Sequence, residues 1–173
     1  MGFDKTICSL GYLCLNKIDF LVSINFNKGV KMGLDQHAHL RGQNIDWEKY
    51  FNDDEYSEKA GVFVWRKHAR LQEFMARKWA EQNPSVKVEG MLAHLGFNAD
   101  QDAPCYMTQE VVDELGEQIA KGFSDYHAED GFFWGQQFQK DSVKEYKEQD
   151  IKFLKFCQQA ISEGKVVEYW CSW

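Results

Sequence analysis

Three segments with the helical spacing of apolar residues alternate along this chain with four short runs of strand-forming residues. The helical segments lie at 68–84, 108–122 and 141–164, and the strand-like runs are MGLDQHAHL, GVFVW, APCYM and KVVEYWCSW. The connections between them are too short and irregular for a doubly wound parallel sheet. This order predicts a single-domain α+β fold, in which a small, largely antiparallel sheet packs with about three helices.

Each predicted helix carries local signals for its boundaries. In the first, apolar residues repeat on one face until Asn83 and Pro84 end the helix. Thr108 stands at the N-cap position of the second helix, and Gly122 closes it. The third and longest helix extends from 141 to just before Gly164. The polar connection over 44–61 has room for one helical turn.

The composition is that of one globular domain. The chain has 173 residues, of which 44% are hydrophobic and 15% aromatic, and it contains only two prolines. A chain of this length buries about two-thirds of the surface exposed by its unfolded form, which is enough for one core. Its net charge of −7 argues against nonspecific binding to nucleic acid or to an anionic membrane, because both present phosphates.

The first 31 residues differ from the others in charge. They carry four lysines and two aspartates, which gives +2, whereas residues 32–173 carry 16 basic and 25 acidic residues, which gives −9. Lys17 and Asp19 lie near the middle of the apolar stretch in this segment, and each such charge disfavours a membrane span by about 2.5–3.5 kcal/mol. No secretory cleavage site is clear. We therefore expect residues 1–31 to form an extension outside a single domain over 32–173.

Cysteine usage indicates a reducing compartment. The five cysteines form an odd set without a CxxC pair, which is a poor pattern for a disulfide framework or a zinc site. They are Cys8, Cys14, Cys105, Cys157 and Cys171. We expect reduced, mostly buried thiols in a cytoplasmic protein. Cys157 lies on the inward stripe of its helix and is expected to be inert.

Alternation in the first strand-like run raises the question of a metal site. Asp35, His37 and His39 occupy every second position, so they project to one face of an extended strand. Carboxylate and imidazole are suitable ligands for zinc or iron, which makes a metal-dependent hydrolase one alternative. Such a site needs a further ligand. The other histidines of the chain are His68, His94 and His127.

Basic residues gather in the segment WRKHAR of an otherwise acidic chain. Arg66 and Lys67 precede a predicted helix, where unpaired N–H groups and the helix dipole favour an anion. We interpret these two residues as candidate ligands for a phosphate or carboxylate. Arg70 and Arg77 fall opposite the apolar stripe, where a solvated face explains them, and Glu73 can pair with Arg77 at i,i+4.

The segment GFFWG places Phe132, Phe133 and Trp134 between two glycines. Aromatic faces beside an arginine commonly hold a base or another planar group, and buried packing explains the same residues equally simply. The chain has no GxSxG motif and no glycine-rich phosphate loop. The sequence therefore indicates binding rather than catalysis.

Four fragments, in order, resemble a family of small proteins found mainly in tailed bacteriophages. They are MGLD from Met32, WRKHARLQEFM from Trp65, GFFWG from Gly131 and the C-terminal YWCSW. The resemblance covers residues 32–173 and implies that translation usually starts at Met32. Family members are often labelled phosphoglycerate kinase, a label that the residues do not support, because such a kinase needs two domains and a much longer chain.

The resemblance also bears on the first strand-like run. It implies large aromatic or apolar side chains at the positions of His37 and His39, which favours a packed strand face over a metal site. Asp35 belongs to the shared MGLD start, and its simplest role is to accept hydrogen bonds from backbone or from an arginine.

These observations lead to one functional hypothesis with two alternatives. We expect a phage accessory protein of the host cytoplasm, without a cofactor, that binds an anionic or nucleotide-like molecule. The expected ligand residues are Asp35, Trp65, Arg66, Lys67, Phe132, Phe133 and Trp134. The alternatives are a binder or inhibitor of a host protein and a metal-dependent hydrolase that uses Asp35, His37 and His39.

Overall fold

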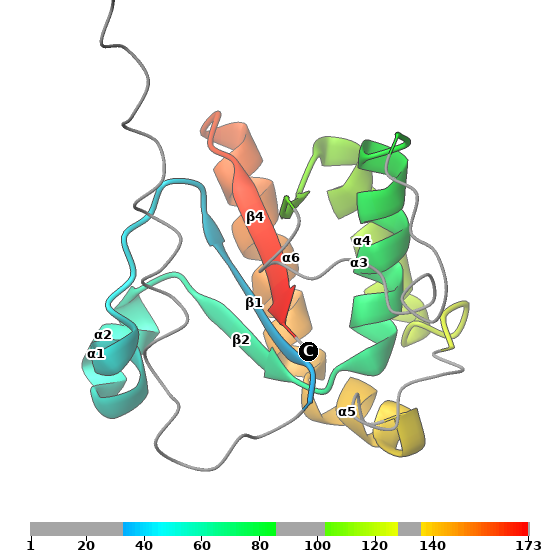
Figure 1. Ribbon diagram of the computed structural model, residues 1–173, viewed down its shortest axis with the longest axis horizontal. Helices are drawn as coiled ribbons and strands as arrows, with labels where there is room; N and C mark the ends of the chain where they lie inside the picture. The colour runs from blue at the N-terminus through cyan, green and yellow to red at the C-terminus, as the bar shows by residue number, and fades with distance from the viewer. Residues whose placement is uncertain (1–32, 86–102, 128–135, 173) are drawn as a thin grey trace, which may run out of the picture. The chain divides into compact units, whose positions relative to one another are not determined.

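A computed structural model describes residues 33–85, 103–127 and 136–172 of the chain. The chain divides between Lys31 and Met32, and every described residue belongs to the part that begins at Met32. The described residues form an α+β fold in which helices accompany one antiparallel sheet (Figure 1), as the order of segments predicted.

The sheet of the described residues has four strands in the order β2-β1-β4-β3, and all neighbouring strands run antiparallel. The strands are β1 (Asp35–Leu40), β2 (Phe63–Arg66), β3 (Cys105–Tyr106) and β4 (Val167–Ser172). Each coincides with one of the four predicted runs, so these predictions are confirmed. Strands β1 and β4, the first and last of the described residues, pair at the centre of the sheet (Figure 1).

Helices occupy the three predicted segments and the polar connection between β1 and β2. They are α1 (Trp47–Asn52), α2 (Asp54–Lys59), α3 (Ala69–Gln82), α4 (Gln109–Lys121), α5 (Gln139–Glu145) and α6 (Lys147–Ser162), with a 3₁₀ turn at Gln136–Phe138. Thr108 accepts a hydrogen bond from the N–H of Val111 at 3.3 Å, so the predicted N-cap of α4 is confirmed. None of the described helices is long and apolar enough to span a lipid bilayer.

The longest predicted helix is not continuous. Tyr146 separates α5 from α6 with φ −90° and ψ 0°, so the prediction of one helix over 141–164 is wrong at this residue. Its hydroxyl accepts a hydrogen bond from the N–H of Arg66 at 3.0 Å and donates one to the carbonyl oxygen of Arg66 at 3.2 Å. The break therefore accompanies a side-chain contact that joins the two helices to the end of β2.

The hydrophobic core lies against one face of the sheet. Strand alternation sends Ala38, Trp65 and Tyr169 to this face, and all three are fully buried. Helix α6 runs behind β4 in Figure 1, and the ring of its Phe153 meets Trp65 edge-on at a centroid distance of 5.0 Å. The predicted stripe of α3 is also buried, which confirms its assignment. It consists of Leu71, Phe74, Met75 and Trp79.

A chain of buried hydrogen bonds crosses this core. The Gln36 side chain accepts from the N–H of His68 at 2.9 Å and donates to the hydroxyl of Tyr169 at 2.7 Å. That hydroxyl donates to Gln72 at 2.8 Å, and the Gln72 amide lies 3.3 Å from the sulfur of Cys171. Burial raises the pKa of Tyr169 well above its usual value, so the phenol stays protonated as a donor. These bonds tie β1, β4 and α3 together.

The cysteines of the described residues are buried and form no disulfide, as the sequence predicted. They are Cys105, Cys157 and Cys171. Burial raises the pKa of Cys105 to about 12 and also raises that of Cys157. Since the thiolate is the reactive form, both side chains behave as packing residues. Cys8 and Cys14 lie outside the described residues.

Candidate functional site

The face of the sheet opposite the hydrophobic core carries most of the chemistry that the sequence singled out. Opposing residues of paired strands project to the same side, so the register defines the members of this outer face. They are Asp35, His37 and His39 of β1, Val64 and Arg66 of β2, Tyr106 of β3, and Glu168, Trp170 and Ser172 of β4. Four of these nine were candidates from the sequence, and the fold brings those four together.

Three rings of the outer face lie parallel. His37 stacks on His39 at a centroid distance of 5.5 Å and an angle of 11°, and on Trp170 at 6.4 Å and 6°. Trp47 of α1 meets His37 edge-on at 5.0 Å. All four side chains are partly exposed. We call these four residues the ring cluster. His37 and His39 pack within this cluster, but the expectation that they face the core is wrong, because their side of the sheet is opposite the main core.

The ring cluster includes an unused hydrogen-bond donor. The indole Nε1 of Trp170 is buried and has no hydrogen-bond partner within the described part of the chain. Burial, reinforced by the charge of His39, lowers the pKa of His37 to about 3, so its imidazole is neutral at pH 7. A neutral imidazole beside an indole is a flat, uncharged surface on which a planar group can stack.

Charged residues lie at both ends of the outer face. Arg66 donates to the carboxylate of Asp35 across β1 and β2, so the expectation that Asp35 accepts from an arginine is confirmed. At the other end, Arg41 follows β1, forms an ion pair with Glu168 at 3.3 Å and lies over the ring of Tyr106 at 5.5 Å. Each arginine is therefore held at an edge of the ring cluster by a carboxylate.

Trp65 lies on the other side of the sheet from Arg66. It stands opposite Gln36 in the register, is fully buried, and donates its indole N–H to Asp150 at 2.9 Å. Consecutive strand residues alternate between faces, so Trp65 and Arg66 cannot contact one small ligand together. The inclusion of Trp65 among the expected ligand residues is thus corrected: it is a core residue.

His68 completes a buried triad with Trp65 and Asp150. Its Nε2 lies 3.1 Å from the second carboxylate oxygen of Asp150, and its Nδ1 accepts the N–H of Leu71 at 3.3 Å. Because Nδ1 accepts, Nε2 carries the hydrogen that Asp150 receives. His68 is therefore the N-cap of α3 and lies on the core side of the sheet, away from His37 and His39.

Lys67 forms the bend between β2 and α3. Its φ of 59° is in the left-handed region, and its N–H donates to the carbonyl oxygen of Leu34 at 3.0 Å. We expected unpaired N–H groups at the start of this helix to bind the anion. The N–H of Leu71, however, already donates to Nδ1 of His68. Arg66 and Lys67 therefore do not share a helix-terminal anion site of the kind predicted.

The other basic residues of α3 have partners within the fold. Arg77 donates to Glu73 at 2.9 Å, which confirms the predicted i,i+4 pair. Arg70 donates to the carbonyl oxygen of Gly122 at 3.2 Å, so it binds the C-terminal end of α4 rather than belonging to a solvated face. The prediction that Arg70 lies on a solvated face is therefore wrong.

The metal alternative finds no third ligand in the described residues. His37 and His39 stack on each other, and no group of three or more metal-ligating side chains is present in ranges 33–85, 103–127 and 136–172. His68 faces the core with Asp150. His94 lies outside the described residues, as do the expected ligand residues Phe132, Phe133 and Trp134.

Two aromatic members of the ring cluster were not singled out from the sequence. Trp170 lies in the final strand, where Val167, Tyr169 and Cys171 alternate with it to the core face. That alternation is visible in the sequence, but assigning a face requires knowing which strands pair. Trp47 belongs to a short helix that the sequence suggested only as a possible turn.

A scan against protein-family models and searches among curated proteins and solved structures return no match for this chain.

Proposed function

We propose that this chain is a non-catalytic binding module whose outer face takes an anionic ligand with a planar ring, such as a nucleotide. On the resemblance to phage proteins, we place it as an accessory protein in the host cytoplasm. The observation that carries the ligand class is the parallel stacking of His37 and Trp170 across β1 and β4, with Arg66 and Arg41 at the two ends.

The ring cluster supports a planar ligand. A base placed on the partly exposed rings of Trp170 and His37 extends a stack that already exists. Base–aromatic stacking contributes about 1–3 kcal/mol per base. The unused N–H of Trp170 adds a donor that can select an acceptor on the ligand once the covering side chains shift.

Arg66 supports the anionic part of the ligand. Its side chain is 34% exposed and that of its partner Asp35 is 53% exposed. An exposed ion pair contributes only about 0–1 kcal/mol, so a phosphate with charge-assisted bonds can replace Asp35 as the partner of Arg66. The net charge of −7 opposes anions at long range, which makes this local contact the decisive one.

Isothermal titration calorimetry with AMP, and with ribose 5-phosphate as the matched compound without a base, tests the proposal. We expect AMP to bind at least tenfold more tightly than ribose 5-phosphate. Arg66→Gln and Trp170→Leu should each weaken AMP binding at least tenfold, while Arg77→Gln, on α3, leaves it unchanged. Thermal unfolding of each variant verifies that the fold is intact.

Two outcomes contradict this proposal. If Arg66→Gln and Arg77→Gln change the affinity equally, the effect of Arg66 is general electrostatics rather than a contact. If neither AMP nor any other of a panel of nucleotides binds, the outer face does not serve a nucleotide-like ligand.

One exposed residue favours a protein partner as a second candidate. Phe51 of α1 is 58% exposed, and its ring stacks on Trp47 of the ring cluster at 6.2 Å. Aromatic residues are enriched in protein interfaces. Crosslinking in a host extract tests this candidate, with Phe51→Ser expected to remove a specific product and Phe138→Ser, at a site 52% exposed on another segment, expected to retain it.

A further inference from the structure

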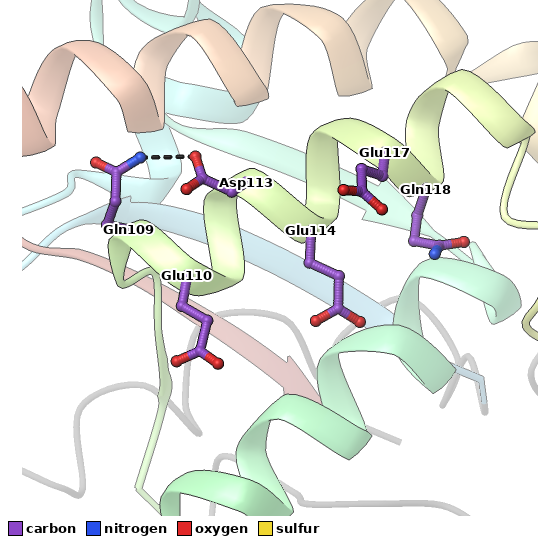
Figure 2. Close-up of a pocket in the computed structure, with 6 residues that line it drawn as sticks. All are labelled: Gln109, Glu110, Asp113, Glu114, Glu117 and Gln118. Carbon is purple, nitrogen blue, oxygen red and sulfur yellow. Dashed lines mark hydrogen bonds between the residues drawn. The ribbon is translucent and has the colours of Figure 1, made fainter.

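Helix α4 carries an acidic face that takes no part in the outer face of the sheet. Residues of this helix line an open hollow in Figure 2. They are Gln109, Glu110, Asp113, Glu114, Glu117 and Gln118. Figure 2 shows the side chains of Glu110, Glu114 and Gln118, four residues apart, leaving the same side of the helix.

Gln118 provides an independent sign of a ligand at this hollow. Its side chain is only 5% exposed, yet its Oε1 has no hydrogen-bond partner in the described residues. Its Nε2 donates to the carboxylate of Asp125 at 3.4 Å, which fixes the orientation of the amide, because a carboxylate can only accept. The unpaired atom is therefore an acceptor. A buried acceptor without a donor is unfavourable unless a ligand supplies that donor.

The charges of the acidic face are only partly balanced within the fold. Glu114 binds the ammonium of Lys78 at 2.5 Å and accepts from the hydroxyl of Tyr126 at 3.1 Å. Burial alone would lower the pKa of Lys78, but the hydrogen bonds that its ammonium donates to Glu114 and Glu81 raise it, so the ammonium stays charged. Glu110 and Glu117 have no ion pair among the described residues and leave uncompensated negative charge on either side of Glu114.

The spacing of the carboxylates does not suit a metal ion. They lie along the helix rather than around a point, and no group of three or more in the described residues could hold a metal ion. Glu117 follows Glu110 by seven positions, which is about 10 Å along the helix axis at 1.5 Å per residue. An extended polypeptide covers the same distance in about three residues at 3.4 Å each.

We propose that this acidic face binds lysine or arginine side chains of a partner polypeptide in extended conformation. One basic side chain lies near Glu117 and donates to Oε1 of Gln118 once the side chains that cover this atom shift. Another basic side chain, about three residues away, pairs with Glu110. This site is separate from the outer face, so it stands or falls independently of the nucleotide proposal.

Fluorescence anisotropy with a labelled peptide that has arginine at every third position in a Gly-Ser background tests the site. We expect Glu110→Gln/Glu117→Gln to weaken binding at least tenfold. The matched control, Glu58→Gln/Glu145→Gln, removes the same charge from two other exposed positions and should change binding less than twofold. Equal losses in the two double variants would show nonspecific attraction to an acidic protein and would overturn the proposal.

Gln118→Leu separates binding from structure. Leucine removes the unpaired acceptor, so we expect the melting temperature to stay constant or rise while the peptide binds at least fivefold more weakly. A variant that binds the peptide as well as the natural protein contradicts the role given to Gln118.

A competition with spermine distinguishes the source of the cation. Displacement of the peptide only at concentrations far above the peptide dissociation constant supports a polypeptide partner. Tighter binding of spermine than of the peptide, with the same dependence on Gln118 and Glu117, would assign the site to a free polyamine and overturn the polypeptide proposal, as would failure of the peptide to bind at all.

Discussion

The imidazole of His68 and the carboxylate of Asp150 meet inside the core, with Nε2 3.1 Å from Oδ2 and side-chain exposures of 0% and 3%. The other oxygen of Asp150 accepts from Trp65 at 2.9 Å. The two donors come from the end of β2 and the N-cap of α3, and the acceptor comes from α6. One carboxylate therefore fixes the strand-to-helix bend against the longest helix.

The first prediction concerns removal of this carboxylate. Asp150→Ala leaves two buried donors unpaired and should lower the free energy of unfolding by about 3–5 kcal/mol. Asp150→Asn keeps an acceptor for Trp65 but turns an N–H toward Nε2 of His68, so it should cost less than the alanine variant. Urea denaturation measures both, with Asp141→Asn on the exposed side of α5 as the control. A loss below about 1 kcal/mol for Asp150→Ala would contradict the role of the pair.

The second prediction concerns pH. The pKa of His37 is lowered from 6.5 to about 3 by burial and by the charge of His39. Below pH 6.5 the unfolded chain therefore binds a proton that the folded chain does not. The contribution of neutral His37 to the free energy of unfolding is therefore complete above pH 6.5. It is lost as the pH falls toward 3, at up to about 1.4 kcal/mol per pH unit.

His37→Phe keeps a ring in the ring cluster and removes this proton. Between pH 7 and pH 5 we expect the variant to lose about 2 kcal/mol less stability than the natural protein, as measured by urea denaturation at the two pH values. Carboxylates that titrate in both proteins cancel in the comparison. Identical pH dependence of the two proteins would show that the environment of His37 does not depress its protonation.

The third prediction concerns the bend at Lys67. A side chain at φ 59° is strained relative to glycine, so Lys67→Gly should raise the free energy of unfolding by about 1 kcal/mol. Lys121→Gly, in the last turn of α4, should lower the free energy of unfolding by about 1 kcal/mol, because glycine disfavours a helix and no backbone strain is removed there. Chemical denaturation of the two variants checks the opposite signs, and a loss of stability in both would exclude strain at Lys67.

The fourth prediction concerns residues 1–31. The core of the described residues begins at Leu34 and is built from the part of the chain after Lys31. A chain that starts at Met32 should therefore melt within a few degrees of the full chain when thermal unfolding is followed by circular dichroism. A large decrease in melting temperature would place part of the core before Met32.

The elements of the fold were predictable because their signals are local. Thr108 and Gly122 cap the two ends of α4 through contacts within one helical turn. The apolar stripe of α3 repeats at helical spacing. The break at Tyr146 was not predictable, because its hydroxyl binds the backbone of Arg66, a residue 80 positions away. No sequence window includes both partners of that contact.

The candidate site was only partly predictable for the same reason. Alternation placed Asp35, His37 and His39 on one face, but which face meets the core depends on the register with β4. The sequence predicted that Asp35 accepts a hydrogen bond from an arginine, but it did not identify that arginine as Arg66. The contribution of Trp170 follows only from the pairing of β1 with β4.

Gln36 has a consequence for how the chain avoids misfolding. Its amide satisfies both the backbone of His68 and the hydroxyl of Tyr169, and it can do so in one alignment of β1 with β4. A slip of one residue would bury the imidazole of His37 in place of Gln36 and leave the Tyr169 hydroxyl without this partner. The buried hydrogen bonds of Gln36 thus specify one register of β1 against β4, where apolar packing alone would tolerate several.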